Sequence, residues 1–336
     1  TTTGTVANVK LEYSTNGFSD ELQTVLIIAS TPNTNSYAWT IPDAISSTVK
    51  VRLTNVSDSA VSDVSNANFT IKGSVTLTAP NGAEIWIVGN AQNITWTRTG
   101  SFANVKLEYS TNAFANELQT VVITASTLAS SLTYAWTIPD AIGNTLKVRI
   151  TDVANATVTD VSNANFEIKG SLTLTSPNGT EVWKVGEIRN ITWTKTGTIL
   201  NAKLDYSTDA GVSYLNVIIA STDATTGTYA WTVPDAIGNQ VRVKITHVSD
   251  AAVNDASNAN FEIKGSLTIT SPNNGEVWLV GASQPITWTK TGTIANAKLE
   301  YSTDGGVTYP NVIIASTPAA AGSYSWTIPD AISNTV

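Results

Sequence analysis

The stretch YAWTVPDA, residues 229–236, decides the fold of this chain because it is one of four near copies of a single phrase. The tryptophans of these copies stand 97, 95 and 95 residues apart, at Trp39, Trp136, Trp231 and Trp326. A second phrase, ITWT, keeps the same steps of 97 and 95 residues, with its tryptophans at Trp96, Trp193 and Trp288. One unit of about 96 residues is therefore repeated in tandem, and the fold is that of the unit.

Each unit has the pattern of short strands and turns. In SLTLTSP, Leu172 and Leu174 alternate with Ser and Thr, and in NITWT, Ile191 and Trp193 share one face. Between such segments stand Pro-Asn-Gly, Asp-Ala-Gly and Pro-Asp-Ala, which are turn-forming combinations. No segment shows a helical apolar stripe. Roughly seven or eight short strands per unit, with one apolar face each, predict an Ig-like β-sandwich.

The repeats set the predicted domain boundaries. We expect an all-β chain of tandem Ig-like β-sandwiches arranged as a rod, because NFEIKGSLTLTSP joins one unit to the next without a flexible linker. The first and last repeats are partial, lacking early and late strands respectively. The predicted domains are repeat 1 (1–73), repeat 2 (74–170), repeat 3 (171–265) and repeat 4 (266–336).

The half-repeats at the two ends allow two interpretations. The favoured one is that the chain is a segment of a longer repetitive chain. The other is head-to-tail completion of one copy by another, as in donor-strand filaments. The middle strands would then be present twice, because both half-repeats carry them, so the two halves do not fit together cleanly.

Composition excludes several classes of function. The net charge is −8 and only 13% of residues are charged, without basic clusters, which argues against nucleic acid or an anionic membrane as partner. The sequence contains no apolar run long enough to predict a membrane span. It also contains no Cys, which excludes disulfides and thiolate chemistry.

A sialidase-like Asp box raises the question of sugar cleavage. YSTDGGVTY, residues 301–309, and YSTDAGVSY, residues 206–214, have its Ser-x-Asp-x-Gly-x-Thr spelling. The equivalent stretches of repeats 1 and 2 carry Asn16 and Asn112 in place of Asp, and an amide cannot replace a catalytic carboxylate. The stretch is therefore predicted to be a hairpin turn.

Two sets of residues are the candidates for binding. The tryptophans of the VWKVG column are the candidate sugar-stacking aromatics, because Val182 and Trp183 cannot share a face, whereas the other two tryptophan columns alternate in phase with core residues. This column is Trp86, Trp183 and Trp278. A loop before the last strand offers candidate calcium ligands, with a plain polar turn as the alternative. These ligands are Asp63, Asp160 and Asp255.

Catalytic chemistry is not predicted. His247 is the only histidine, which rules out a catalytic triad in every repeat and a multi-histidine metal site. The acidic residues are expected to be scattered over outward strand faces and turns rather than paired across a cleft. We therefore expect no enzyme activity, no catalytic residues and no cofactor.

The unit resembles a known family of surface domains. LTSPNGTEVWKVGEIRNITWTKTG, TGTYAWTVPDAIGNQVRVKITHVSD and NFEIKG together look like the Ser/Thr-rich, GPI-anchored-type Ig-like domain of fungal cell-wall-synthesis proteins. The same domain type occurs as tandem arrays in large bacterial surface proteins. This resemblance implies a cell-surface β-sandwich and carries over no catalytic or ligand residue.

The expected function is that of a non-enzymatic extracellular or cell-surface structural protein, such as a stalk, fibre, sheath, filament or adhesin shaft. Its partners would be other copies of itself or neighbouring repeats. An alternative is a carbohydrate-binding array that attaches to cell-wall or matrix polysaccharide. A third is an accessory region of a secreted enzyme whose catalytic domain lies elsewhere.

Overall fold

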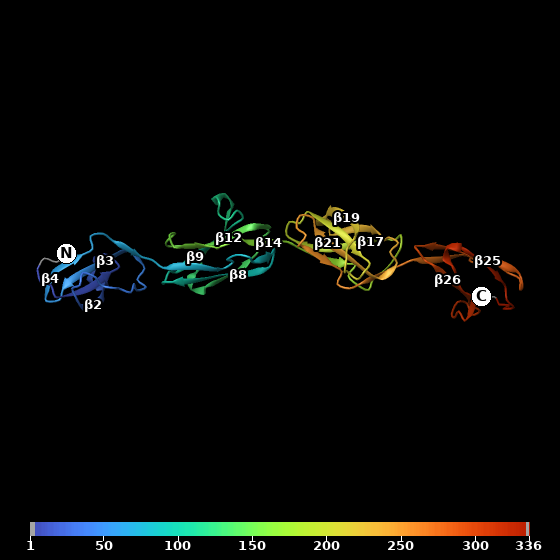
Figure 1. The fold of residues 1–336 in the computed structure, drawn as a ribbon, viewed down its shortest axis with the longest axis horizontal. Coiled ribbons are helices and arrows are strands. Elements are labelled where there is room, and N and C mark those ends of the chain that lie inside the picture. The colour runs from blue at the N-terminus through green and yellow to red at the C-terminus, as the bar shows by residue number, and fades with distance from the viewer. Residues whose placement is uncertain (1–3, 334–335) are drawn as a thin grey trace. The chain divides into compact units, whose positions relative to one another are not determined.

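The computed structural model describes residues 4–333 and residue 336. They fall into two compact units, one ending at Lys169 and the other beginning at Gly170. Figure 1 shows strands in every part of the chain, and the only helical elements among the described residues are three-residue 3-10 turns. None of the described helices is long and apolar enough to cross a membrane. The predicted all-β class is confirmed.

Repeat 3 is a complete two-layer sandwich. One layer has the strand order β15-β17-β20, and the other has the order β16-β23-β21-β18-β19, with β22 paired to β21. All pairs are antiparallel except β16 with β23. Its elements are β15 (Ser171–Ser176), β16 (Val182–Lys184), β17 (Ile188–Thr196), β18 (Asn201–Ser207), β19 (Asn216–Asp223), η4 (Ala224–Thr226), β20 (Thr228–Thr232), β21 (Gly238–His247), β22 (Asn254–Ala256) and β23 (Phe261–Lys264). Two facing sheets with this order are an Ig-like sandwich.

Repeat 2 has the same topology. Its layers are β11-β8-β6 and β10-β9-β12-β14-β7, with β13 paired to β12. Its elements are β6 (Ser74–Ala79), β7 (Ile85–Ile87), β8 (Ala91–Thr99), β9 (Asn104–Ser110), η2 (Glu117–Gln119), β10 (Thr120–Leu128), η3 (Ala129–Ser131), β11 (Thr133–Thr137), β12 (Gly143–Asp152), β13 (Thr159–Val161) and β14 (Phe166–Lys169). Both complete repeats have nine strands rather than the seven or eight expected, because two three-residue segments in each also pair.

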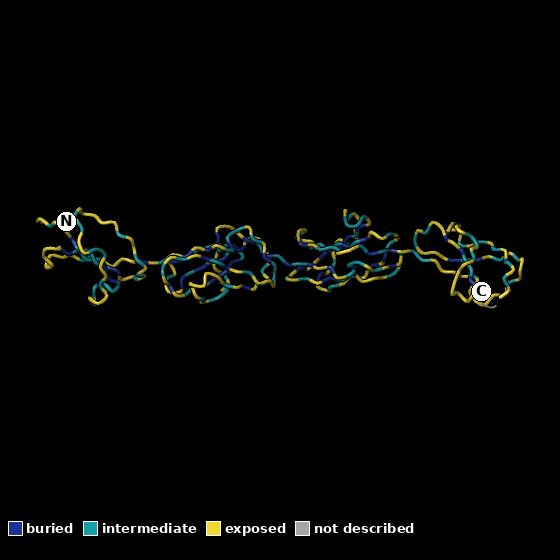
Figure 2. Tube along the Cα trace, turned by 90° about the horizontal axis from the view of Figure 1, so that it is seen from below, coloured by how far each residue is buried: buried dark blue, intermediate teal, exposed yellow. Residues whose placement is uncertain are grey.

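The core of each complete repeat lies between its layers, as the dark blue segments of Figure 2 show for repeat 2. Alternation within the strands explains this burial. On β17, Ile191 is fully buried and Trp193 is 3% exposed, while Thr192 between them is only partly buried. The Trp193 indole donates a hydrogen bond of 3.0 Å to the carbonyl of Ala224, which satisfies its one polar atom. The core role predicted for this tryptophan column is confirmed.

Repeat 1 contains one layer only. Its sheet has the order β2-β1-β3-β4, with β5 paired to β3. Its elements are β1 (Asn8–Ser14), η1 (Glu21–Gln23), β2 (Thr24–Pro32), β3 (Ser46–Asn55), β4 (Asp58–Val64) and β5 (Phe69–Ile71). Tyr37–Thr40 carries the YAWT phrase but is not a strand, contrary to the sequence pattern. The physical reason is pairing: β11 and β20 pair with β8 and β17, and residues 4–73 contain no counterpart of those partners.

Repeat 4 contains one three-stranded layer, β24-β25-β28, and one hairpin, β26-β27. Its elements are β24 (Ser266–Ser271), β25 (Ser283–Thr291), β26 (Asn296–Tyr301), β27 (Asn311–Pro318), η5 (Ala319–Ala321) and β28 (Ser323–Thr327). Ile286 and Trp288 remain buried here, whereas Leu267 and Ile269 on β24 are about half exposed. Burial is thus incomplete where the second layer is only a hairpin.

Candidate functional site

The VWKVG tryptophans do not form an exposed platform. Trp86 and Trp183 are only 7% and 6% exposed. Each lies on a short strand that pairs in parallel with the last strand of its repeat, and this pairing turns the tryptophan inward and its neighbours outward. Trp183 packs against Phe261 with ring centroids 5.1 Å apart. These two candidates for sugar stacking are enclosed, because Ile85 beside Trp86 and Val182 beside Trp183 take the outer face instead.

The third member of that column, Trp278, lies in repeat 4 and is half-buried. Its ring stands 6.2 Å from that of Trp326. Trp183 has a phenylalanine on the last strand of its repeat, and residues 266–333 have no equivalent strand. The extra exposure of Trp278 therefore reflects incomplete packing around a core position.

The candidate calcium aspartates have a different role in the complete repeats. The Oδ2 atom of Asp160 accepts a hydrogen bond of 2.7 Å from the main-chain amide of Leu77, and Asp255 accepts the same bond from Leu174. These bonds tie β13 and β22 to the first strand of the opposite layer. Asp63, the equivalent residue of repeat 1, has no such amide partner among the described residues. Within them there is also no group of three or more His, Cys, Asp or Glu placed to hold a metal.

The Asp-box stretches are hairpin turns with satisfied polar groups. Asp209 accepts hydrogen bonds from the Ser207 hydroxyl at 2.5 Å and from the amide and hydroxyl of Ser213 at 2.9 and 2.6 Å. The Ser207 hydroxyl and then the Ser213 groups lower the pKa of Asp209 to about 2, and the Ser302 hydroxyl followed by Thr308 does the same for Asp304. A carboxylate held in this way is a poor proton donor or acceptor near neutral pH.

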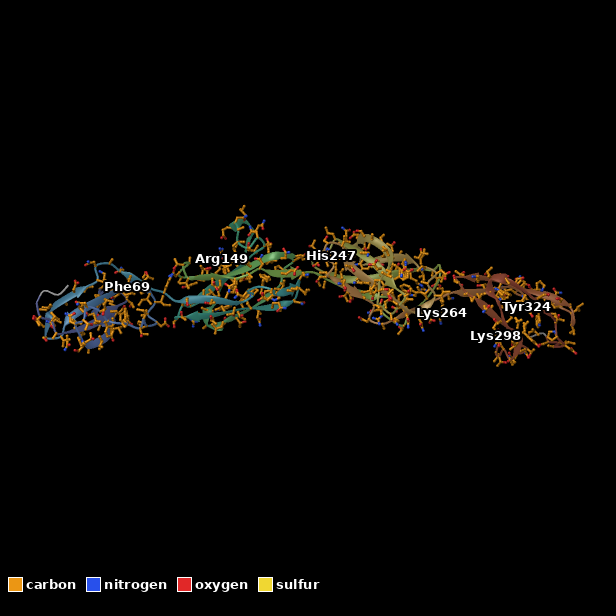
Figure 3. The ribbon with its side chains drawn as sticks, in the orientation of Figure 1. Phe69, Arg149, His247, Lys264, Lys298 and Tyr324 are labelled. Carbon is orange, nitrogen blue, oxygen red and sulfur yellow. The ribbon has the colours of Figure 1, made fainter. Side chains whose placement is uncertain are left out.

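An ion-pair cluster with one buried and one exposed carboxylate lies at the hairpin of repeat 2. Arg149 on β12, labelled in Figure 3, bonds Glu108 on β9 at 3.0 Å and Glu117 at the hairpin tip at 2.9 Å. Its guanidinium also lies over the Phe114 ring, 4.6 Å from the centroid. Arg149 lowers the pKa of Glu117, chiefly through their hydrogen bonds. Repeat 1 builds the same cluster around Arg52.

For the acidic residues on outward strand faces, the sequence predicted the direction of the side chain but not its burial. Glu108 is 5% exposed and Asp205 is 4% exposed, although both point away from the sandwich core. They are covered on the outer face of their sheets by neighbouring long side chains, Lys106 in one case and Lys203 in the other, which pair with them at 2.8 and 3.0 Å. Sequence alternation gave the correct face but could not show that this face is covered.

The joints between repeats inside each unit carry a second arrangement that sequence reasoning missed. Asp43 of repeat 1 accepts hydrogen bonds from the amide and hydroxyl of Ser101 in repeat 2, at 2.9 and 2.5 Å. Asp235 of repeat 3 accepts the same pair from Thr293 in repeat 4, at 2.9 and 2.5 Å. In each case the hydroxyl, followed by the amide, lowers the pKa of the aspartate.

A glycine next to each of these hydroxyl residues lets the two repeats approach closely. Gly100 has φ +82°, and a Cβ there would lie 3.0 Å from Ile45 and 3.3 Å from the Asp43 carboxylate. Gly292 has φ +85° and the same surroundings, with Ile237 and Asp235 both 3.2 Å away. The sequence signal was available, since each aspartate of PDA precedes its hydroxyl partner by 58 residues in both joints.

Comparisons with known proteins do not assign the chain to a family. No family model matches the chain, and no curated protein matches it. Among solved structures, fibronectin(III)-like modules of Clostridium thermocellum CbhA are 21% identical, with 56% of this chain and 94% of theirs covered, at a TM-score of 0.22. The four N-terminal Ig domains of Dscam1 isoform 1.9 are 11% identical, with 98% of this chain and 82% of that chain covered, at a TM-score of 0.25. Titin A168169 is 11% identical, with 57% of this chain and 97% of that chain covered, at a TM-score of 0.27. At these TM-scores the fold rests on the strand order alone.

Proposed function

We propose that this chain is a non-enzymatic structural repeat protein of the cell surface or extracellular space, in which tandem Ig-like sandwiches form a rod. In this role the chain would serve as a stalk, fibre, sheath or filament, and its partners would be neighbouring repeats or other copies of itself. The observation that carries the proposal is the joint, which is built twice from the same residue types in the same geometry.

The joint supports a spacing role for a physical reason. A tandem chain can act as a spacer only if successive domains hold a preferred orientation, and short connections with specific contacts favour one. Here Lys-Gly-Ser connects the repeats, and an aspartate of one repeat accepts two hydrogen bonds from the next. Near-identical repeats also agree with spacing better than with the recognition of several different ligands.

The carbohydrate-binding alternative has less support from the complete repeats. Stacking on a sugar ring requires an accessible aromatic face, and Trp86 and Trp183 are enclosed by their own cores. The family resemblance to fungal cell-wall-synthesis proteins stays an interpretation of sequence patterns only.

Small-angle scattering of the full chain tests the structural proposal. We expect an elongated particle, and we expect the double variant Asp43→Ala/Asp235→Ala to give a broader distribution of distances with unchanged circular dichroism. A matched control is Asp20→Ala/Asp209→Ala, which changes two hairpin carboxylates that accept hydrogen bonds within their own hairpins. A compact particle, or equal behaviour of the two double variants, would contradict the proposal. Protease shaving of intact source cells tests the location, and resistance of the chain in intact cells would contradict a surface position.

A further inference from the structure

The chain contains four Asn-Gly pairs, which begin at Asn16, Asn81, Asn178 and Asn274. In such a pair the main-chain nitrogen of the glycine can attack the side-chain amide of the asparagine, because glycine has no Cβ to hinder the approach. The reaction releases ammonia and leaves an acidic residue. In a folded chain it requires that the two reacting groups be free to meet. The structure therefore separates pairs that look alike in the sequence.

Two of these pairs, one in repeat 2 and one in repeat 3, are restrained at the glycine. The amide of Gly82 donates a hydrogen bond of 2.8 Å to the carboxylate of Glu84, and Gly179 makes the same bond to Glu181. The nitrogen must lose its proton before it attacks, and a carboxylate beside it opposes the negative charge that results. A Cβ on either glycine would also lie 2.6 Å from an alanine of the neighbouring turn, so the main chain has little room to move. We call these the restrained pairs, and we expect both to react slowly.

The pair in the hairpin of repeat 1 has neither restraint. The amide of Gly17 makes no hydrogen bond among the described residues. The hydroxyl of Ser14 donates a hydrogen bond of 2.5 Å to Oδ1 of Asn16, and it is fixed in this direction because it accepts the amides of Asn16 and Phe18 at 3.3 and 3.2 Å. Negative charge develops on this oxygen when the side-chain carbon is attacked, so the hydroxyl stabilises that charge. The nucleophile is free, and the carbonyl that it attacks is activated.

Repeat 2 supplies a matched site with alanine in place of the glycine. Ser110 makes the same three hydrogen bonds to Asn112 and Phe114, at 2.5, 3.2 and 3.1 Å. Ala113 has φ +56°, close to the +70° of Gly17. The layer that carries this hairpin is present in both repeats, so the comparison does not depend on the strands that repeat 1 lacks. The two sites differ at the reacting nitrogen by one Cβ.

We propose that Asn16 is a site of spontaneous deamidation in the folded chain. The nitrogen of Gly17, after passing its proton to hydroxide, forms a bond to Cγ of Asn16. The Cγ–Nδ2 bond then breaks, the leaving nitrogen takes a proton from water and departs as ammonia, and a succinimide ring remains. One water molecule opens the ring at either carbonyl, which gives aspartate or isoaspartate. The reaction needs only water and hydroxide, and the site is independent of the proposed spacing role.

The two products would change the hairpin of repeat 1 differently. Aspartate at this position adds one negative charge and gives repeat 1 the Ser-x-Asp spelling of repeats 3 and 4. Isoaspartate carries the main chain through its side chain, which lengthens a tight turn by one carbon atom. In this turn Phe18 has φ +64° and its ring lies 4.7 Å from the guanidinium of Arg52. We therefore expect isoaspartate to open the turn and to separate Phe18 from Arg52.

Incubation of the full chain in a mildly alkaline buffer, followed by peptide mapping with mass spectrometry, tests the site. Asn16 should react about tenfold or more faster than Asn112, which has a Cβ at the attacking residue, and faster than both restrained pairs by a similar factor. Asn274 lies in an exposed loop and serves as the reference that the conditions allow the reaction. In denaturant all the Asn-Gly pairs should react at similar rates. A native rate at Asn16 no higher than that of the restrained pairs would overturn the proposal.

A pair of exchanged residues locates the cause. Gly17→Ala should lower the rate at Asn16 to that of Asn112, and Ala113→Gly should raise the rate at Asn112 to that of Asn16. Both variants keep a residue that the same φ accepts, since alanine and glycine already occupy the two sites, and circular dichroism checks the fold. If Ala113→Gly folds and leaves Asn112 unreactive, the role assigned to Gly17 is wrong. Hydrogen exchange at the Phe18 amide should rise in the isoaspartate form, and an unchanged rate would contradict the opening of the turn.

Discussion

Repeats 3 and 4 have almost the same first strand, but the strand is buried to a different extent in the two repeats. Leu174 on β15 is 2% exposed, and its equivalent Ile269 on β24 is 50% exposed. The strands have the same pattern and pair in the same register with the following strand. The difference is the opposite layer, which in repeat 3 includes β21, β22 and β23. Burial of this first strand therefore depends on the opposite layer, whereas Ile286 and Trp288 of repeat 4 are buried without those three strands.

The largest expected effect comes from the inner tryptophan column. Trp183→Ala should destabilise repeat 3 by about 3–5 kcal/mol, because it removes a buried ring packed against Phe261 and Trp231. Trp278→Ala should cost less than half as much, since Trp278 has only Trp326 as an aromatic neighbour. Native-state hydrogen exchange of the full chain, resolved by repeat, measures both. Equal losses would show that repeat 4 is as well packed as repeat 3.

Substitutions on the first strand should give the next largest difference in stability between repeats 3 and 4. Leu174→Ala should destabilise repeat 3 by about 2–5 kcal/mol, as expected for a buried leucine. Ile269→Ala, its matched control, should change repeat 4 by only about 0.5 kcal/mol, because half of the side chain is already in water. The same exchange measurement applies. A large loss from Ile269→Ala would mean that β24 is covered in solution.

The aspartates that hold the first strand give a smaller effect. Asp160→Ala should destabilise repeat 2 by about 1–3 kcal/mol, because the amide of Leu77 loses its acceptor in a partly buried place. Asp63→Ala, the matched control, should leave the stability of repeat 1 unchanged, because Asp63 has no such amide partner among the described residues. Exchange of the Leu77 amide itself is the direct readout, and an unaltered rate in Asp160→Ala would contradict the strand-holding role. Addition of calcium to the unmodified chain is the parallel test of the metal hypothesis, which predicts a calcium-dependent shift in the same exchange rates.

The smallest expected effect depends on pH and distinguishes the hairpin of repeat 3 from those of repeats 1 and 2. The pKa of Asp209 is lowered from 3.8 to about 2 in the folded chain. The contribution of its carboxylate to the stability of the hairpin is therefore complete above about pH 4 and is lost as the pH falls toward 2. Repeats 1 and 2 have Asn16 and Asn112 in the same place, and these do not titrate. We expect amides of the Asp209 hairpin, but not of the Asn112 hairpin, to lose protection over this range.

The control for the pH effect is Asp209→Asn, which should make the hairpin of repeat 3 insensitive to acid. An NMR titration of the Ser213 amide measures it directly, because that amide donates to Asp209 at 2.9 Å. A midpoint near 3.8 rather than near 2 would show that the carboxylate gains nothing from Ser207 and Ser213.

Local pattern was enough to predict most of the strands and most of the core. Alternation placed Ile191 and Trp193 inside, and YSTDAGVSY forms the hairpin turn that its residues predict. These predictions depend on residues close in sequence. The inward position of Trp183 was missed because it depends on parallel pairing with β23, about 80 residues away, and a three-residue strand gives too little alternation to choose a face.

The other misses have the same cause. Asp160 lies 83 residues from the amide it binds, and Asp43 lies 58 residues from Ser101, so neither pair is visible in a local pattern. The enclosure of Glu108 depends on which side chains cover the outer face of a sheet, and alternation alone does not report this. In each case the sequence pattern places a polar side chain in a turn or on the surface. Its actual contacts depend on how distant strands are arranged in the sandwich.

The parallel pairing of β16 with β23 has a consequence for mechanical load. These two strands lie near the start and the end of repeat 3, and their register runs from Val182↔Glu262 to Lys184↔Lys264. When the two ends of a repeat are pulled apart, parallel strands near opposite ends slide along each other, so their hydrogen bonds are strained together rather than one after another. Repeat 2 has the same arrangement in β7 and β14. Tension along a complete repeat would therefore load the few hydrogen bonds of this parallel pair at the same time.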